Sequence, residues 1–249
     1  MRVFTTVAML LLLLAGCDQS PAVDVKTASA PPPAAVKPRD GIGVAIVVDI
    51  SGSMSGTVND TGGHTSPKDE IARRAVRELF SRSQGFCQRN PERTVEVGLF
   101  AFDDKVSQIM PFAKPDPTAA AGPINTLRPN GGTAIGAAIL SAKQALDATG
   151  LSAKHIVVVT DGENTANRDY TSSNPANAVN IDPRTALACT NAKAQGITVF
   201  VVKVIEGNSD MLRACATRPD YFYDLSSASQ LNTALSAVFE AIKKTRLTQ

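Results

Sequence analysis

Apolar residues along this chain form short β-branched runs that alternate with stretches of helical periodicity. The runs that indicate buried strands are 44–50, 95–102, 156–160 and 197–205. The helical patterns are a segment that would bury Ile71, Ala72, Ala75, Val76, Leu79 and Phe80, and others at about 134–149, 183–195, 209–216 and 229–244. Strands that alternate with helices predict an α/β fold, a doubly wound and mostly parallel sheet with helices on both faces.

Turn and cap residues predict two local boundaries. Ser66 can cap the first helix and Pro67 fits its first turn, so this helix is expected to begin there. Asp103-Asp104 indicates a turn, after which 106–110 would pair antiparallel with the strand before it. The sheet is therefore expected to carry one antiparallel strand at an edge.

The segment Asp49-Ile50-Ser51-Gly52-Ser53 places a carboxylate and two hydroxyls at alternate positions where the first strand ends. Alternate side chains of a nearly extended backbone point the same way, and Gly52 lets the chain tighten. Oxygen ligands suit a hard cation such as Mg²⁺, or Mn²⁺ or Ca²⁺, whereas zinc sites usually contain Cys or His. The strand end therefore predicts part of a divalent-cation site.

Two further segments supply oxygen atoms that this motif lacks. Thr133 follows the turn 129–132 and precedes a helical pattern, so its hydroxyl lies at a helix start. Asp161 follows the β-branched run 156–160, which places it, like Asp49, at the carboxyl end of a strand. Open parallel sheets bind ligands at this edge, and we therefore expect one site there.

These three segments, in this order, resemble the metal-ion-dependent adhesion site (MIDAS) of von Willebrand factor A (vWA) domains. The family pattern Asp-x-Ser-x-Ser, then Thr, then Asp corresponds residue by residue to Asp49, Ser51, Ser53, Thr133 and Asp161. The resemblance covers about residues 41–249 and implies a Rossmann-like vWA fold. It also implies that an Asp or Glu of a protein partner completes the coordination of the ion, and that the last helix can shift as the site changes state.

Each candidate ligand also has a purely structural interpretation. Asp49 and the serines could bond the backbone of a turn, Thr133 could only cap a helix, and Asp161 could only begin a turn. Two carboxylates that converge on one sheet edge would repel each other without a cation between them, which favours the metal site. A metal-free scaffold that keeps the motif without using it remains an alternative.

A magnesium-dependent hydrolase or phosphatase is the alternative from another class, because Mg²⁺ with an open position acts as a Lewis acid. The sequence contains no Asp-x-Asp pair, glycine-rich phosphate loop or Gly-x-Ser-x-Gly elbow. His64 lies in a polar loop and His155 leads a strand, and neither stands beside a candidate nucleophile. We therefore expect a binding domain and not an enzyme.

The N-terminus is expected to target and anchor the chain. A basic residue and the apolar run 7–14 indicate a secretory signal, and Leu14-Ala15-Gly16-Cys17 resembles a bacterial lipobox. Residues 1–16 would then be the signal peptide and Cys17 the lipidated residue that anchors the chain in a membrane. Asp18 resembles the signal that retains lipoproteins on the inner membrane of Gram-negative bacteria, on its periplasmic side. An ordinary signal peptide with an incidental cysteine is the alternative.

Residues 17–40 are expected to form a tether. Residues 18–40 hold five prolines among Ala, Ser, Thr and Val, without a periodic apolar pattern. A single domain at 41–249 would follow. The chain is 43% hydrophobic, which allows a sizeable core, and its net charge of +2 gives no indication of nucleic-acid binding.

Three cysteines would remain after lipidation of Cys17, and one disulfide is expected among them in an oxidising compartment. Cys189 lies on the helix before the strand 197–205 and Cys215 on the short helix after it, so the two could meet at one end of the sheet. We favour this pair. Cys87 would then be buried or available for an intermolecular bond.

The C-terminal third resembles the vWA domains of TadG-type proteins, which belong to tight-adherence (Tad) pilus assembly. The segments that carry this resemblance are 188–190, 193–197, 212–216 and 221–224, with the closing helix. TadG-type proteins usually have a transmembrane N-terminus, whereas this chain has a lipobox and a tether. The combined expectation is a lipid-anchored domain that binds a protein partner in pilus or envelope assembly. The loops 55–65 and 165–181 are the candidates for partner contact.

Overall fold

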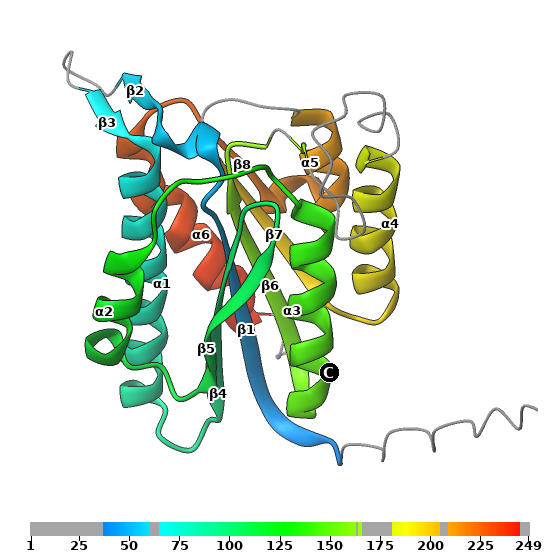
Figure 1. The fold of residues 1–249 in the computed structure, drawn as a ribbon. Helices are drawn as coiled ribbons and strands as arrows, with labels where there is room; N and C mark the ends of the chain where they lie inside the picture. Colours follow the sequence, from blue (N-terminus) through cyan, green and yellow to red (C-terminus); the bar gives the residue numbers. More distant parts are fainter. Residues whose placement is uncertain (1–36, 60–64, 163, 166–180, 205–208, 245–249) are drawn as a thin grey trace, which may run out of the picture. The chain divides into compact units, whose positions relative to one another are not determined.

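The computed structural model describes residues 37–59, 65–162, 164–165, 181–204 and 209–244 (Figure 1). The expected signal peptide, the lipobox with Cys17, most of the tether and His64 lie outside these ranges, as does the loop segment 166–180. Among the described helices, none is both long enough and apolar enough to cross a membrane.

Six strands form one sheet in the order β5-β4-β1-β6-β7-β8. They are β1 (Arg39–Asp49), β4 (Val95–Phe102), β5 (Val106–Ala113), β6 (Leu151–Thr160), β7 (Thr198–Val204) and β8 (Phe222–Leu225). Every neighbouring pair is parallel except β4 and β5, which pair antiparallel at one edge. The predicted doubly wound, mostly parallel sheet with one antiparallel edge strand is confirmed.

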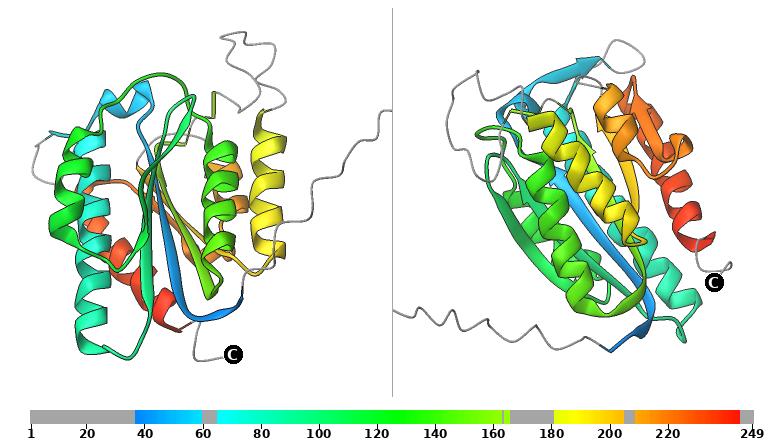
Figure 2. Two further views of the ribbon diagram at one scale, coloured as in Figure 1. Left: turned by 60° about the horizontal axis from the view of Figure 1, so that its bottom comes forward. Right: turned by 90° about the vertical axis from the view of Figure 1, so that its right-hand side faces the viewer.

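Helices cover both faces of the sheet (Figures 1 and 2). One face carries α1 (Lys68–Arg89), α2 (Pro117–Thr126) and α6 (Leu231–Lys244), and the other carries α3 (Ile135–Thr149), α4 (Ile181–Ala194) and α5 (Ser209–Cys215). Residues of β1 alternate between the two faces: Ile46 packs with α1 and α6, and Val47 with α3 and α4. A strand covered on both sides is apolar at successive positions, which explains its continuous apolar run.

The start of α1 differs from the prediction. Ser66 and Pro67 belong to a two-stranded hairpin, β2 (Thr57–Asn59) and β3 (Thr65–Pro67), and α1 begins at Lys68. Because Ser66 pairs with Val58, the chain is extended there, and no side-chain hydrogen bond caps the first turn. The prediction that Ser66 caps the helix was therefore wrong.

Two short elements, α2 and β8, were not predicted from the sequence. Gly122 and Pro123 interrupt the helical pattern of α2, but Asp116 caps this helix through the N–H groups of Thr118 and Ala119 at 2.9 and 3.1 Å. The strand β8 has only four residues, which are too few to show a periodic pattern. Short elements of this kind form where tertiary packing covers them.

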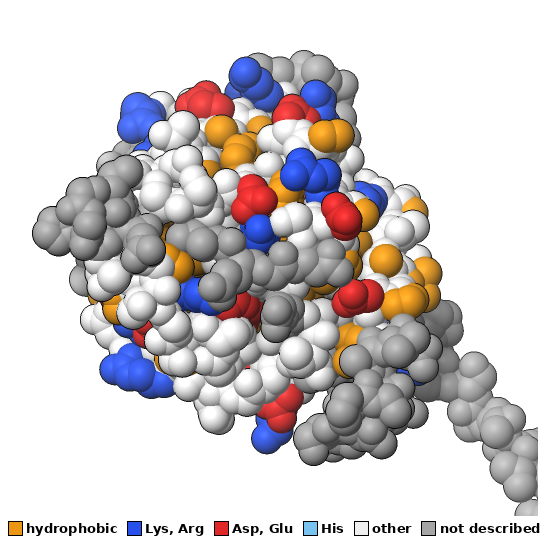
Figure 3. All heavy atoms as spheres, turned by 90° about the horizontal axis from the view of Figure 1, so that it is seen from above, with side chains coloured by type: hydrophobic (Ala, Val, Ile, Leu, Met, Phe, Trp, Pro, Cys, Tyr) orange, Lys and Arg blue, Asp and Glu red, His pale blue; other side chains and the backbone are white. Residues whose placement is uncertain are grey.

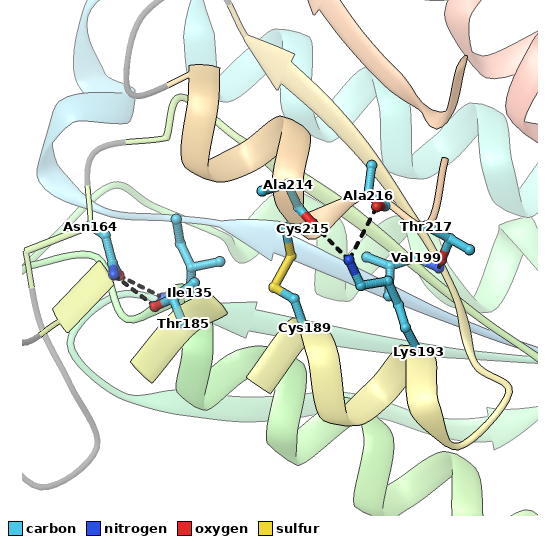
Figure 4. The surroundings of a disulfide bond; sticks show 10 residues. All are labelled: Ile135, Asn164, Thr185, Cys189, Lys193, Val199, Ala214, Cys215, Ala216 and Thr217. Carbon is cyan, nitrogen blue, oxygen red and sulfur yellow. Dashed lines mark hydrogen bonds between the residues drawn. A yellow bond between two sulfur atoms is a disulfide. The ribbon is translucent and has the colours of Figure 1, made fainter. Parts of the chain in front are cut away.

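A disulfide joins α4 to α5 (Figure 4). The Sγ atoms of Cys189 and Cys215, the pair favoured from the sequence, are 1.99 Å apart. The ammonium of Lys193 donates to the backbone oxygen of Ala214 at 2.7 Å, so a second contact links the two helices. Cys87 is a buried free thiol in α1.

Candidate metal centre

Asp49 and Asp161 lie at the carboxyl edge of the sheet. Asp49 is the last residue of β1, and Asp161 follows Thr160, the last residue of β6. The two strands are parallel neighbours with Val48 opposite Val159, so both segments leave the sheet at the same edge. This placement agrees with the one expected from the two β-branched runs.

Hydrogen bonds connect the first motif to Asp161. The N–H of Ser51 donates to Asp49 Oδ1 at 2.7 Å, and the hydroxyl of Thr160 donates to Asp49 Oδ2. The Oγ atoms of Ser51 and Ser53 are 3.0 Å apart, and Ser53 Oγ donates to Asp161 Oδ1 at 3.0 Å. Four of the five candidate ligands therefore belong to one cluster, and of these four only Ser53 is exposed.

The loop that carries Thr133 is held against the first motif through its backbone. The N–H of Asn130 donates to the oxygen of Ile50 at 2.7 Å, and the N–H of Gly52 donates to the oxygen of Gly131 at 3.0 Å. Thr133 itself is buried. The fifth candidate ligand thus lies on a loop that is bonded to the segment carrying the first three.

Gly131 makes this close approach possible. Its φ is +66°, a left-handed conformation that favours glycine. A Cβ atom at this position would lie 2.6 Å from Asp104 Oδ1. The turn Asp103-Asp104 therefore lies directly against the Thr133 loop, and the N–H of Ala134 donates to the oxygen of Asp103 at 2.8 Å.

Asn164 and Thr165, which the sequence analysis missed as site residues, hold the segment after Asp161. The N–H of Thr133 donates to Thr165 Oγ1 at 2.9 Å. Asn164 accepts from the N–H of Ile135 at 3.3 Å and donates to Thr185 Oγ1 at 2.7 Å, which links the starts of α3 and α4 (Figure 4). Polar residues directly after Asp161 were the only signal, since their partners lie on other segments.

Burial raises the pKa of one carboxyl group of the cluster, that of Asp49. Asp49 and Asp161 are each 1% exposed. Burial raises the pKa of Asp49 to about 6, hydrogen bonds from Ser51 and Thr160 oppose this shift, and the charge of Asp161 adds to it. The cluster therefore brings two buried carboxyl groups together, and their charged forms need a compensating positive charge.

Lys68, the first residue of α1, supplies one such charge. Its Nζ lies 3.2 Å from Asp161 Oδ2, and the two side chains are 3% and 2% exposed. This contact was not predicted from the sequence, because lysines are usually exposed. The position of Lys68 along the chain gave one indication of such a contact. A basic side chain at a helix N-terminus interacts unfavourably with the helix dipole, so a nearby acidic group is needed to stabilise it.

The donor set fits a hard divalent cation. It consists of two carboxylates and three hydroxyls, all oxygen donors of the kind that Mg²⁺ and Ca²⁺ prefer. Adjacent ligands of an octahedral Mg²⁺ lie about 3 Å apart, because each Mg–O distance is about 2.1 Å. The Ser51–Ser53 and Ser53–Asp161 oxygen distances, both 3.0 Å, match this spacing. In the part of the chain that the structure describes, no three His, Cys, Asp or Glu side chains form a group that could hold an ion.

Sequence comparison identifies the domain. Residues 44–163 match the family model of the von Willebrand factor type A domain, and this range contains all five candidate ligands. The chain contains a vWA domain. A search of curated proteins found no match.

Solved structures share the fold of this vWA domain at low sequence identity. The vWF domain of the type V pili tip protein Mfa5 from Porphyromonas gingivalis aligns with a TM-score of 0.67 and 15% identity, over 84% of this chain and 96% of that one. The conserved hypothetical protein BatB from Bacteroides thetaiotaomicron aligns with a TM-score of 0.59 and 22% identity, over 84% and 100%. Proximal thread matrix protein 1 from the mussel byssus, solved with a zinc-occupied MIDAS motif, aligns with a TM-score of 0.57 and 15% identity, over 83% and 47%. Likeness at these identities extends to the fold alone.

Proposed function

We propose that the vWA domain binds a protein partner through a divalent cation held by Asp49, Ser51, Ser53, Thr133 and Asp161. The observation that carries this proposal is the oxygen cluster at the sheet edge, where two buried carboxyl groups share one hydrogen-bonded cluster with Ser51 and Ser53. Lys68 balances only one of the two negative charges. Mg²⁺, or Mn²⁺ or Ca²⁺, balances the remainder when it is bound.

A carboxylate of the partner completes the coordination. Five side-chain oxygens leave an octahedral ion one ligand short. The exposed side chain of Ser53 lies where a ligand can approach from solvent. Seen from this edge, acidic and basic side chains are interspersed on the domain surface (Figure 3). Either water or a carboxylate could be the sixth ligand. We propose an Asp or Glu of the partner, because a carboxylate carries a negative charge that attracts the cation and water does not.

The setting that we propose is the periplasmic side of the inner membrane. Lipidation of Cys17 would anchor the chain, and the segment 18–40 would tether the domain. As polyproline II, its 23 residues would reach about 70 Å from the lipid surface. The resemblance to TadG-type proteins and the structural likeness to a pili tip protein support a role in pilus or envelope assembly.

The arrangement supports binding over hydrolysis. The Oγ atoms of Ser51 and Ser53 are 3.0 Å apart, and Ser53 Oγ donates to Asp161 Oδ1. Among the described residues, no histidine is bonded to these groups. His155, the only histidine that the structure describes, stands six positions before Asp161 on β6, about 20 Å away along the strand. We therefore propose that the site binds an ion and does not activate a nucleophile through a neighbouring base.

Calorimetric titration of Mg²⁺ and Mn²⁺ into the full-length chain in detergent tests the site. We expect the wild-type chain to bind an ion and Asp49→Ala to lose this binding. Asp147→Asn is the matched control, because Asp147 pairs with Lys143 at 2.9 Å and Lys154 at 2.7 Å and has no contact with the cluster. Its ion affinity should equal that of the wild type.

A pull-down from envelope extract, with and without a chelator, then tests whether partner capture depends on the ion. If the wild-type chain binds no divalent cation yet still captures a partner, the metal-mediated mechanism is wrong. The domain would then be a metal-free scaffold whose loops carry recognition.

A further inference from the structure

The side chain of Lys68 is built into the candidate metal centre. The N–H of Lys68 donates to the oxygen of Gly56 at 2.9 Å, which joins the start of α1 to the turn after Ser53. A Cβ atom at Gly56 would lie 3.6 Å from Lys68 Cε and 3.8 Å from its Nζ. The lysine therefore runs alongside this turn to reach Asp161.

Asp161 divides its two oxygens between different partners. Oδ1 accepts the hydroxyl of Ser53, and Oδ2 faces the ammonium of Lys68 at 3.2 Å. Because both charged side chains are almost wholly removed from water, the attraction between them is weakly screened. A cation that approaches Asp161 meets this ammonium at short range.

We propose that the ammonium of Lys68 is an internal cation that competes with the divalent ion for Asp161 and thereby sets the affinity of the vWA domain for its metal. This inference rests on the proposed function, because it takes Asp161 to be a ligand. A divalent ion at the cluster repels the ammonium across a few ångströms of low-dielectric protein. Binding of the ion therefore requires Lys68 to withdraw from Asp161, and the loss of that ion pair weakens metal binding.

Substitution of Lys68 by a neutral side chain of similar length tests this competition. Calorimetric titration of Mg²⁺ into the full-length Lys68→Met chain should give a dissociation constant lower than that of the wild type by about tenfold or more, since a neighbouring charge shifts cation binding to a carboxylate by at least this factor. Lys68→Arg keeps the charge and should stay close to the wild type.

Lys203→Met is a matched control. Lys203 is also a buried lysine, 5% exposed, and its Nζ pairs with Asp224 Oδ1 at 2.9 Å, away from Asp161. Its substitution removes a comparable buried charge and should leave the Mg²⁺ affinity unchanged. A gain in affinity common to both methionine variants would overturn the assignment to Lys68.

The wild-type chain provides a test that does not depend on how a variant folds. Amine acetylation, followed by peptide mass spectrometry, reports how accessible each lysine is. Saturating Mg²⁺ should increase the labelling of Lys68 several-fold and leave Lys203 unchanged, because only Lys68 is displaced.

The possible outcomes separate the two proposals. Equal or weaker Mg²⁺ binding by Lys68→Met, or unchanged labelling of Lys68 when Mg²⁺ binds, overturns the competition and leaves the metal site standing. In that case Lys68 only positions Asp161. If neither the wild type nor Lys68→Met binds any ion, the proposed metal site fails together with this inference.

Discussion

Asp49 combines deep burial with a candidate role as a ligand, so a proton and a divalent ion should compete for its carboxylate. The pKa of Asp49 is raised to about 6, chiefly because the side chain is buried. At lower pH the carboxyl is protonated, and we expect the Mg²⁺ affinity to fall by about tenfold for each pH unit below 6. Calorimetric titrations above and below pH 6 measure this change. A constant affinity down to about pH 5 would contradict it.

His155 is the second residue whose burial alters its titration. It is fully buried on β6, 6.1 Å from the ring of Phe200, and burial lowers the pKa of His155 to about 4. In the unfolded chain the pKa is about 6.5. As the pH falls from about 6.5 to about 4, His155 becomes protonated in the unfolded chain but stays neutral in the folded chain. Stability is therefore fully present above this window and is lost towards its lower end.

Between pH 7 and pH 4 we expect the free energy of unfolding of His155→Leu to fall by about 3 kcal/mol less than that of the wild type. Urea denaturation of both proteins at the two pH values measures the difference. Asp49 acts in the opposite sense, because its raised pKa lets the folded state hold a proton more tightly. The comparison of variant and wild type is therefore the informative quantity. An equally steep loss in His155→Leu would mean that another group causes it.

Loops from three distant parts of the chain build the site, and their backbone contacts decide where the candidate ligands lie. Gly131 is the most constrained position among these contacts, since it combines a left-handed φ with the close approach of Asp104. The loop 130–133 is bonded to Ile50 and Gly52 on one side and reaches α3 on the other. Displacement of this loop should therefore move Thr133 relative to the other oxygens.

We expect Gly131→Ala to cost about 1–2 kcal/mol of stability and to weaken Mg²⁺ binding, because the new Cβ strains the backbone and collides with Asp104. Gly196→Ala is the control: its φ is +76°, but a Cβ there meets nothing within 4 Å. It should show a similar loss of stability with normal Mg²⁺ binding. Urea denaturation and calorimetry on both variants separate strain from damage to the site. Equal Mg²⁺ affinities in the two variants would contradict this prediction.

At the scale of the whole molecule, the sheet edge links metal binding to folding. The candidate ligands come from segments that only the folded sheet brings together, so an unfolded chain cannot bind the ion in the same way. The fold itself is shared with proteins of 15% and 22% identity. Function must therefore be argued from the site and not from the fold.

Mg²⁺ at a hundred times its dissociation constant should raise the free energy of unfolding by about 2.7 kcal/mol, because only the folded state binds it. Urea denaturation with and without Mg²⁺ measures this shift, with Asp49→Ala as the comparison. An equal shift in the variant would place the stabilising ion elsewhere in the protein.

Local patterns were sufficient for the main elements of the fold. The runs that became β1, β4 and β7 were predictable because a strand buried on both faces is apolar at most successive positions. The beginning of α1 was predicted wrongly, since Ser66 pairs with Val58 in a hairpin that its own neighbours do not indicate. Likewise, α2 depends on the burial of Ala120 and Ile124, which overrides the unfavourable Gly122-Pro123 pair.

Local sequence patterns were enough to predict the strand ends that carry Asp49 and Asp161, because a β-branched run followed by an acid and a turn is a local signal. As metal ligands these residues stay a prediction. The packing of distant segments brings Lys68 to Asp161, 93 positions away, and lets Asn164 join α3 to α4. The burial that raises the pKa of Asp49 likewise results from the packing of the folded chain. Contacts and burial of this kind depend on how distant segments pack, and no pattern along the chain records them.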